Sequence, residues 1–294
     1  MERIRLPSPI FTFQAAPNEP PRKVDCFPFA DRKTLWADYL GRPLLFNPEM
    51  RQLDFMPCLN KPKSMPLSLF VPNAEADDDY DHYCRGSSLF VMERAPGPEH
   101  NWSTPWSDQF EAFVYCKPTS LPFTKSWLWQ LLPPPPYVRE VKHWRSGARP
   151  EISSYALLGS HICISVSGVG TYCLDTASHT WRKAGNWTLP FHGKVEYVPE
   201  LKLWFGFTTE ARHLAAADLS SAMDMGSQPQ LVTGSWKNEL YLPEEWKERN
   251  DSLLVNLGSG RFCVVRFADI RNCLLWICQA EAFPLLFVYL YQEV

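Results

Sequence analysis

The sequence predicts an all-β fold, a β-propeller of about five to six four-stranded blades. Short apolar segments alternate with polar turns along most of the 294 residues, and the composition includes 27 Pro and 14 Gly, which punctuate such segments. Polar residues that end predicted strands also recur at a spacing in the forties, which is typical of propeller blades. The pattern leaves open the number of blades and whether the ring closes.

The clearest repeat covers residues 170–181. Residues 171–174 have the pattern of a strand, residues 175–180 form a polar turn, and Trp181 starts the returning strand. Side chains alternate between the two faces of a sheet, so a large aromatic residue at this point can pack over its neighbours. We therefore predict that Trp181 is a buried anchor of its blade.

The same pattern recurs from residue 34 onward. Leu53 follows Asn47 by six residues, as Trp181 follows Asp175. The strand-ending positions have spacings of 46, 82, 43 and 51, and the spacing of 82 approaches the others once an insertion at residues 94–108 is removed. These positions are Asn47, Glu93, Asp175, Asp218 and Asp269.

The pattern divides the chain into three segments. Residues 1–22 are Pro-rich and predict a partly ordered arm, residues 23–270 the propeller domain, and residues 271–294 an apolar tail. The tail could be a closing strand pair, an ill-fitting end that exposes apolar surface, or a membrane anchor, although Glu281 would be costly in lipid. Residues 243–249 start with Pro and two acids and predict a short helix.

Tryptophan supplies the predicted structural anchors. The chain contains 12 Trp, and several stand in strand patterns at blade spacing, which favours core packing over a ligand groove. The predicted anchors are Trp127, Trp129, Trp181, Trp187 and Trp204.

The nine cysteines predict a reducing compartment. They are scattered, odd in number and contain no Cys-x-x-Cys pair, while Cys163, Cys173 and Cys263 fall inside apolar strand patterns. This usage is typical of buried free thiols. Because the N-terminal residues also lack the apolar core of a signal peptide, we expect a cytoplasmic or nuclear protein.

No pattern for catalysis or cofactor binding is present. The seven histidines form no metal-binding pair, and the chain contains neither a nucleophile elbow nor a phosphate-binding loop. A net charge of −3 argues against nucleic acid as a partner. We therefore expect a protein that is not an enzyme and needs no metal or cofactor.

Seven short phrases of the sequence are characteristic when taken together. They are Ser126-Trp-Leu-Trp, Leu132-Pro-Pro-Pro-Pro-Tyr-Val138, Gly170-Thr-Tyr-Cys-Leu-Asp-Thr176, Trp187-Thr-Leu-Pro-Phe-His-Gly193, Glu196-Tyr-Val-Pro-Glu200, Leu203-Trp-Phe-Gly206 and Leu257-Gly-Ser-Gly-Arg-Phe-Cys263. These phrases resemble an uncharacterised family of kelch-like proteins from grasses, a domain of unknown function. The resemblance runs from about residue 30 to 267, and it implies a kelch-like propeller without catalytic residues. The chain lacks the Gly-Gly doublet of kelch blades, and Gly168-Val-Gly170 comes nearest to it.

The predicted function is a non-catalytic protein-interaction module with an unknown partner, because propellers present binding loops on a rigid scaffold. The candidate surfaces are the insertion at residues 94–108 and an acidic loop that lacks the ligand spacing of a calcium site. The alternatives are a small-ligand binder or enzyme that uses the propeller axis, and a substrate receptor of a ubiquitin ligase. The acidic loop contains Glu75, Asp77, Asp78, Asp79 and Asp81.

Overall fold

The computed structural model describes most of the chain. The described residues are 24–29, 33–72, 87–99, 104–116, 126–144, 149–210, 212–223, 228–232, 247–248, 252–258, 261–270, 273–281 and 287–292, and the last three ranges are described largely by their backbone. The predicted N-terminal arm and the acidic loop lie outside these residues.

The predicted all-β class is confirmed. The described parts of the chain contain twenty strands and three short 3₁₀ helices, and most neighbouring strands are antiparallel. The chain divides into two compact units, which we describe separately. The first unit contains Phe13–Glu151 and Leu174–Trp181, and the second contains Met1–Thr12, Ile152–Cys173 and Arg182–Val294.

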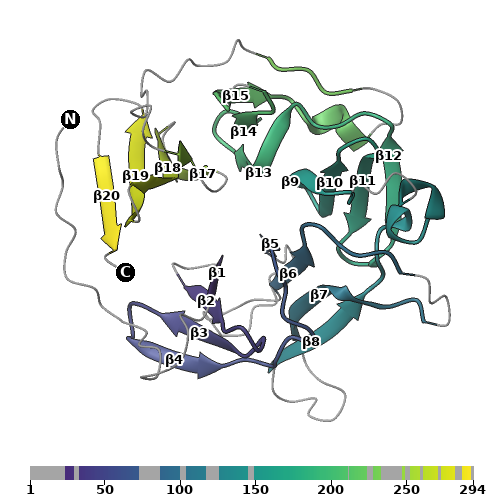
Figure 1. The fold of residues 1–294 in the computed structure, drawn as a ribbon, viewed down its shortest axis with the longest axis horizontal. Helices are drawn as coiled ribbons and strands as arrows, with labels where there is room; N and C mark the ends of the chain where they lie inside the picture. The colour runs from purple at the N-terminus through teal and green to yellow at the C-terminus, as the bar shows by residue number, and fades with distance from the viewer. Residues whose placement is uncertain are drawn as a thin grey trace. The chain divides into compact units, whose positions relative to one another are not determined.

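The first unit contains two four-stranded antiparallel sheets whose strands follow one another in chain order (Figure 1). One consists of β1 (Asp25–Pro28), β2 (Thr34–Ala37), β3 (Pro43–Asn47) and β4 (Gln52–Phe55), and the other of β5 (Pro66–Val71), β6 (Ser88–Glu93), β7 (Ser107–Cys116) and β8 (Ser126–Leu132). The 3₁₀ helices η1 (Pro136–Val138) and η2 (Val141–His143) follow.

The remaining strands form two larger sheets. The order of the seven-stranded sheet is β12-β11-β10-β9-β13-β14-β15, and its only described parallel pair joins β9 to β13. Its strands are β9 (Ile152–Leu158), β10 (His161–Val166), β11 (Gly170–Asp175), β12 (Trp181–Gly185), β13 (Phe191–Val198), β14 (Leu203–Thr208) and β15 (Leu214–Ala217), followed by η3 (Ser220–Met223).

The five-stranded sheet contains the C-terminal strands, so the apolar tail is a strand pair rather than an isolated segment.

Lys247–Glu248 form a strand, so the helix predicted for residues 243–249 is wrong at these two positions. In the described part of the chain, no helix has the length and apolar character needed to cross a membrane. The strands are β16 (Lys247–Glu248), β17 (Leu253–Gly258), β18 (Arg261–Ile270), β19 (Cys273–Glu281) and β20 (Phe287–Gln292).

Two turns have the same structure, as the repeat spacing predicted. The Asn47 side chain accepts the amides of Glu49 and Met50, and the Asp175 side chain accepts the corresponding amides in the β11–β12 turn. The fifth residue of each turn has a left-handed backbone, with φ 53° at Arg51 and 54° at His179. Side chains that accept nearby amides favour this kind of turn.

A buried carboxylate lies at the centre of the first unit. The carboxylate of Glu111 in β7 accepts hydrogen bonds from the backbone amides of Asn60 and Lys61 at 2.8 and 3.3 Å. It also accepts one from the indole N–H of Trp129 and forms an ion pair with Lys63. The Lys63 and Glu111 side chains are both almost fully buried. Burial lowers the pKa of Lys63 despite the opposing effect of Glu111, so the charged lysine depends on this carboxylate.

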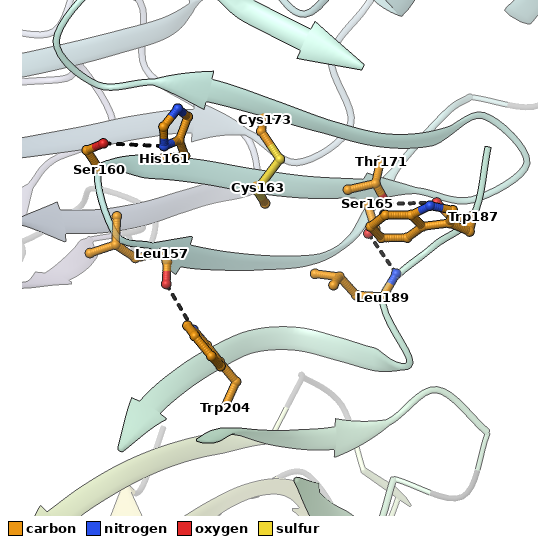
Figure 2. The surroundings of a disulfide bond; sticks show 10 residues. All are labelled: Leu157, Ser160, His161, Cys163, Ser165, Thr171, Cys173, Trp187, Leu189 and Trp204. Carbon is orange, nitrogen blue, oxygen red and sulfur yellow. Dashed lines mark hydrogen bonds between the residues drawn. A yellow bond between two sulfur atoms is a disulfide. The ribbon is translucent and has the colours of Figure 1, made fainter. Parts of the chain in front are cut away.

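The structure corrects the prediction that Cys163 and Cys173 are free thiols, because they are joined in a disulfide between β10 and β11 (Figure 2). Both are about 1% exposed and lie in an apolar cluster with Leu189, Phe191 and Trp204. Cys26, Cys58 and Cys116 are free thiols. The side chain of Cys263 lies outside the described part of the chain.

We expect Glu111→Gln to destabilise the protein by about 3–5 kcal/mol, because it leaves the Lys63 ammonium group buried without its counterion. Urea unfolding would measure the loss. The matched control is Asp108→Asn, which removes the exposed partner of Lys61 and should change stability by less than about 0.5 kcal/mol. Equal effects of the two substitutions would contradict the central role of Glu111.

We expect Trp181→Ala to destabilise the protein through lost packing against Phe110 and a lost hydrogen bond. The indole N–H of Trp181 donates a hydrogen bond to the Pro133 carbonyl at 2.8 Å. The rings of Trp181 and Phe110 lie edge to face, with their centroids 6.4 Å apart. Because Trp181 is half-buried, the cost should lie at the lower end of the about 3–5 kcal/mol typical of buried tryptophan.

Trp181→Phe keeps most of the ring and should cost less, about 0.5–1.5 kcal/mol for the hydrogen bond. Trp106→Ala, at a half-exposed position in the insertion, serves as the control and should change the unfolding midpoint little. If Trp181→Ala unfolds at the wild-type midpoint, Trp181 is not an anchor.

Candidate functional site

The candidate functional site is a cavity of about 660 Å³ in the first unit. Residues of β3 and β4 line one side, and residues near the β7–β8 connection line the other. Its volume falls within the range of about 300–1,000 Å³ that is usual for ligand pockets. The lining residues are Lys33, Leu45, Asn47, Met50, Gln52, Asp54, Phe55, Pro57, Tyr115, Ser126 and Trp127.

Strand register places four of these residues on one face of the first sheet. Leu45 pairs with Asp54 and Asn47 with Gln52 across the β3–β4 ladder. Residues two apart on a strand share a face, so all four side chains point to the same side. The Gln52 amide donates to the Asp54 carboxylate at 2.7 Å, which orients both polar groups beside the cavity.

Aromatic rings form part of the other wall. Trp127 pairs with Tyr115 across β7 and β8, and their ring centroids lie 5.1 Å apart. Trp127 also meets Phe29 edge to face at 5.1 Å. The Trp127 ring at the cavity wall is thus packed against two other aromatic rings.

Beside the cavity, β4 is an open strand edge. It pairs with β3, and no other described strand pairs with it. All four of its residues are exposed, whereas the outer strands β8 and β12 are partly buried. Phe55 is 90% exposed, and Met50 and Leu53 are 55% and 38% exposed. An edge with exposed apolar side chains can pair with another chain.

The cavity contains no recognisable catalytic arrangement. Its polar side chains are those of Lys33, Asn47, Gln52, Asp54, Tyr115 and Ser126, and the Asn47 carbonyl group already accepts two turn amides. In the described part of the chain, no cluster of three or more His, Cys, Asp or Glu side chains could hold a metal ion. The apolar part of the walls can contact an apolar group, and the polar side chains can bond to a polar group attached to it.

The structure distributes the five predicted tryptophan anchors among different roles. Trp127 lines the cavity, Trp129 donates to Glu111, and Trp181 is half-buried. Trp187 packs against an apolar cluster of the second unit, and Trp204 is 8% exposed and donates to the Leu157 carbonyl at 3.0 Å. Trp127, Trp129 and Trp181 belong to the first unit, and Trp187 and Trp204 belong to the second.

The insertion is folded against its own unit where it is described. The Gln109 side chain donates to the Gly97 carbonyl at 3.0 Å and to the Glu99 carboxylate at 2.8 Å. Arg139 pairs with Glu99 and donates to the Thr104 carbonyl at 2.9 Å. These bonds tie the described ends of the insertion, residues 94–99 and 104–108, to β7 and η1, and Trp106 is half-exposed there.

The strand-ending acids bind separate backbone segments. Asp38 accepts the amides of Leu40 and Arg42 at 2.9 Å each, and Glu93 accepts the amides of Ser64 and Met65. The Asp218 side chain accepts the Ser220 amide, and hydrogen bonds from Ser220 lower the pKa of Asp218. Asp38 and Asp218 thus support their own turns, whereas Glu93 holds the distant segment that leads into β5.

Neither the cavity nor the exposed edge was predicted from the sequence. The alignment of Leu53 with the anchor Trp181 suggested a packed position, but the Leu53 side chain is 38% exposed. The sequence does contain one indication of the apolar surface. Leu53 and Phe55 alternate with the polar residues Gln52 and Asp54, so one face of this strand is apolar.

Searches of known proteins return structural similarity at low sequence identity. The Malassezia sympodialis allergen Mala s 1 is 11% identical, with a TM-score of 0.41 over 88% of this chain and 75% of its own. The β-propeller domain of Cps50 (Swd1) from Myceliophteria thermophila is 10% identical, with a TM-score of 0.40 over 92% and 89%.

The Dos1 propeller is also 10% identical, with a TM-score of 0.37 over 89% of this chain and 57% of its own. These matches say nothing about ligands or partners of the chain. No curated protein matches the sequence. A family described as "Protein of unknown function (DUF1668)" matches residues 1–285, almost the whole length. The chain therefore belongs to the DUF1668 family.

Proposed function

We propose that the protein is a non-catalytic interaction module on a kelch-like β-propeller scaffold. Two four-stranded sheets in chain order, β1–β4 and β5–β8, support the scaffold, because such sheets are the blades of propellers. A third run of four strands, β9 to β12, has the same order within the larger sheet. A ring of five to six blades would accommodate this repeat.

The partner that best fits the candidate site is an extended peptide segment of another protein. The observation that carries this proposal is the exposed β4 edge, with Phe55 at 90% exposure, directly beside the cavity. An extended segment can add a strand to such an edge through backbone hydrogen bonds, while pockets beside the edge select alternate side chains. The cavity would receive one apolar side chain.

The chemistry of the cavity defines the expected peptide. Trp127, Tyr115 and Leu45 offer apolar contacts, and the Asp54 carboxylate offers a hydrogen-bond acceptor near its edge. An aromatic or large aliphatic residue with a donor group beside it therefore fits best. Aromatic side chains are also the usual anchors of protein interfaces.

We also propose a cytoplasmic or nuclear location, which the free thiols of Cys26, Cys58 and Cys116 favour and the Cys163–Cys173 disulfide does not. In that setting the module would present its β4 edge to a partner while the sheets act as a rigid support. Recruitment of a partner to a ubiquitin ligase is one use of such a module.

A selection from a library of random peptides tests the proposed function. Peptides selected on the purified protein should contain an apolar anchor residue, and Phe55→Lys should weaken their binding at least about tenfold, which corresponds to about 1.4 kcal/mol. Because Phe55 is almost fully exposed, the unfolding midpoint should stay unchanged. Titration calorimetry would measure the affinities.

The control is Leu201→Lys, which changes an exposed apolar residue of the β13–β14 turn and should leave binding intact. Leu45→Trp, which adds a large ring at the cavity wall, should also weaken binding. Selected peptides that bind Phe55→Lys and Leu45→Trp as tightly as wild type would refute the site. A small molecule that binds the cavity while no peptide is selected would favour the small-ligand alternative.

A further inference from the structure

We propose that the Cys163–Cys173 pair is a redox-sensitive clamp, whose disulfide state determines how firmly the loop at residues 186–190 is held. The cysteines belong to adjacent strands, β10 and β11, that are joined by a short turn with a Val169 amide to Val166 carbonyl bond of 3.1 Å. Figure 2 shows the disulfide between the two strands and the loop beside them.

A pair of hydroxyl groups lies next to the disulfide on the same two strands. Ser165 and Thr171 are each two residues nearer the turn than the cysteines, so the two pairs share one face of the hairpin. Their hydroxyl oxygens are 2.8 Å apart, and both residues are almost completely buried. The disulfide therefore sets the strand separation beside a buried polar contact.

These hydroxyl groups form a directed chain of hydrogen bonds that begins and ends on the loop. The Leu189 amide donates to the Ser165 hydroxyl at 2.9 Å, and the Thr171 hydroxyl donates to the Trp187 carbonyl at 2.7 Å. Thr171 has one hydroxyl proton, so the proton between the two side chains must come from Ser165. Each hydroxyl group donates once and accepts once, and the chain is complete only while Ser165 and Thr171 stay in contact (Figure 2).

Close packing connects the hairpin to the same loop. Gly170 has φ +123°, and a Cβ there would lie 2.3 Å from the Gly185 carbonyl oxygen. A Cβ on Gly185 would lie 2.1 Å from Nε1 of Trp187. The loop also inserts Leu189, which is 2% exposed, into the cluster that contains both cysteines. A change in the separation of β10 and β11 would therefore also shift the loop at residues 186–190.

Reduction would change that separation. Two thiol sulfur atoms cannot approach as closely as two bonded ones, so the reduced cysteines push β10 and β11 apart beside Ser165 and Thr171. In the oxidising direction, the two thiols lose two protons and two electrons and form the S–S bond, while a small-molecule disulfide such as oxidised glutathione accepts them and becomes two thiols. Because both sulfurs are buried, exchange requires local opening of the hairpin.

Hydrogen exchange of the full chain in oxidised and reduced glutathione tests the clamp. The Leu189 amide should exchange at least about tenfold faster after reduction, because its acceptor Ser165 is no longer fixed. Amides of β6 (Ser88–Glu93), which belongs to the first unit, should keep their rates. Alkylation followed by intact mass measurement establishes the state of the pair in each sample.

Two variants separate the clamp from a general loss of stability. Thr171→Val breaks the hydrogen-bond chain without touching sulfur, and its Leu189 amide should exchange fast in both states. The double variant Cys163→Ser/Cys173→Ser should resemble the reduced wild type under all conditions. The proposal fails if Leu189 exchanges equally in verified oxidised and reduced wild type, if reduction occurs only with global unfolding, or if oxidised glutathione does not form the bond.

Discussion

The backbone constraint on a four-stranded antiparallel sheet determines much of this structure. The two inner strands satisfy their N–H and C=O groups on both sides, while each outer strand leaves half of its groups for water, a loop or another chain. In the first sheet β2 and β3 are inner strands and β4 is an outer one. The exposed edge is thus a consequence of the architecture, and the apolar residues on it are what make it unusual.

The interior of the first unit depends on one polar group in an apolar setting. Glu111 holds the segment that follows β4, through the amides of Asn60 and Lys61, against the sheet that contains β7. The same segment contributes Met56 and Leu59 to the apolar cluster. Because a buried carboxylate is tolerated only when its acceptors are occupied, the segment has one favourable position, and that position fixes Pro57 at the cavity.

Local features were predictable from the sequence, and contacts between distant residues were not. The equal spacing from Asn47 to Leu53 and from Asp175 to Trp181 predicted two equivalent turns. This worked because the Asn47 and Asp175 side chains bond to amides only a few residues further along the chain. The ion pair of Lys63 with Glu111 joins residues 48 positions apart, which no periodicity reveals. The exposure of Phe55 depends on which element covers its face, and that is a property of tertiary structure.

The Cys163–Cys173 disulfide could be predicted from the sequence only in part. Cys163 and Cys173 are equally far from Gly168, which lies in the turn with φ +73°. Placing the turn there would have predicted that the two cysteines face each other, but the scattered, odd set of nine cysteines favoured free thiols. Spacing is informative about a disulfide only after the register of the hairpin is known.

The left-handed residues Arg51 and His179 explain why the repeats of this chain are hard to recognise. Each turn requires a left-handed backbone at its fifth position, which a residue other than glycine adopts at a cost in free energy that the rest of the turn must offset. Neither turn carries a glycine at this position. A search for recurring glycines would pass over both turns, although their backbones match.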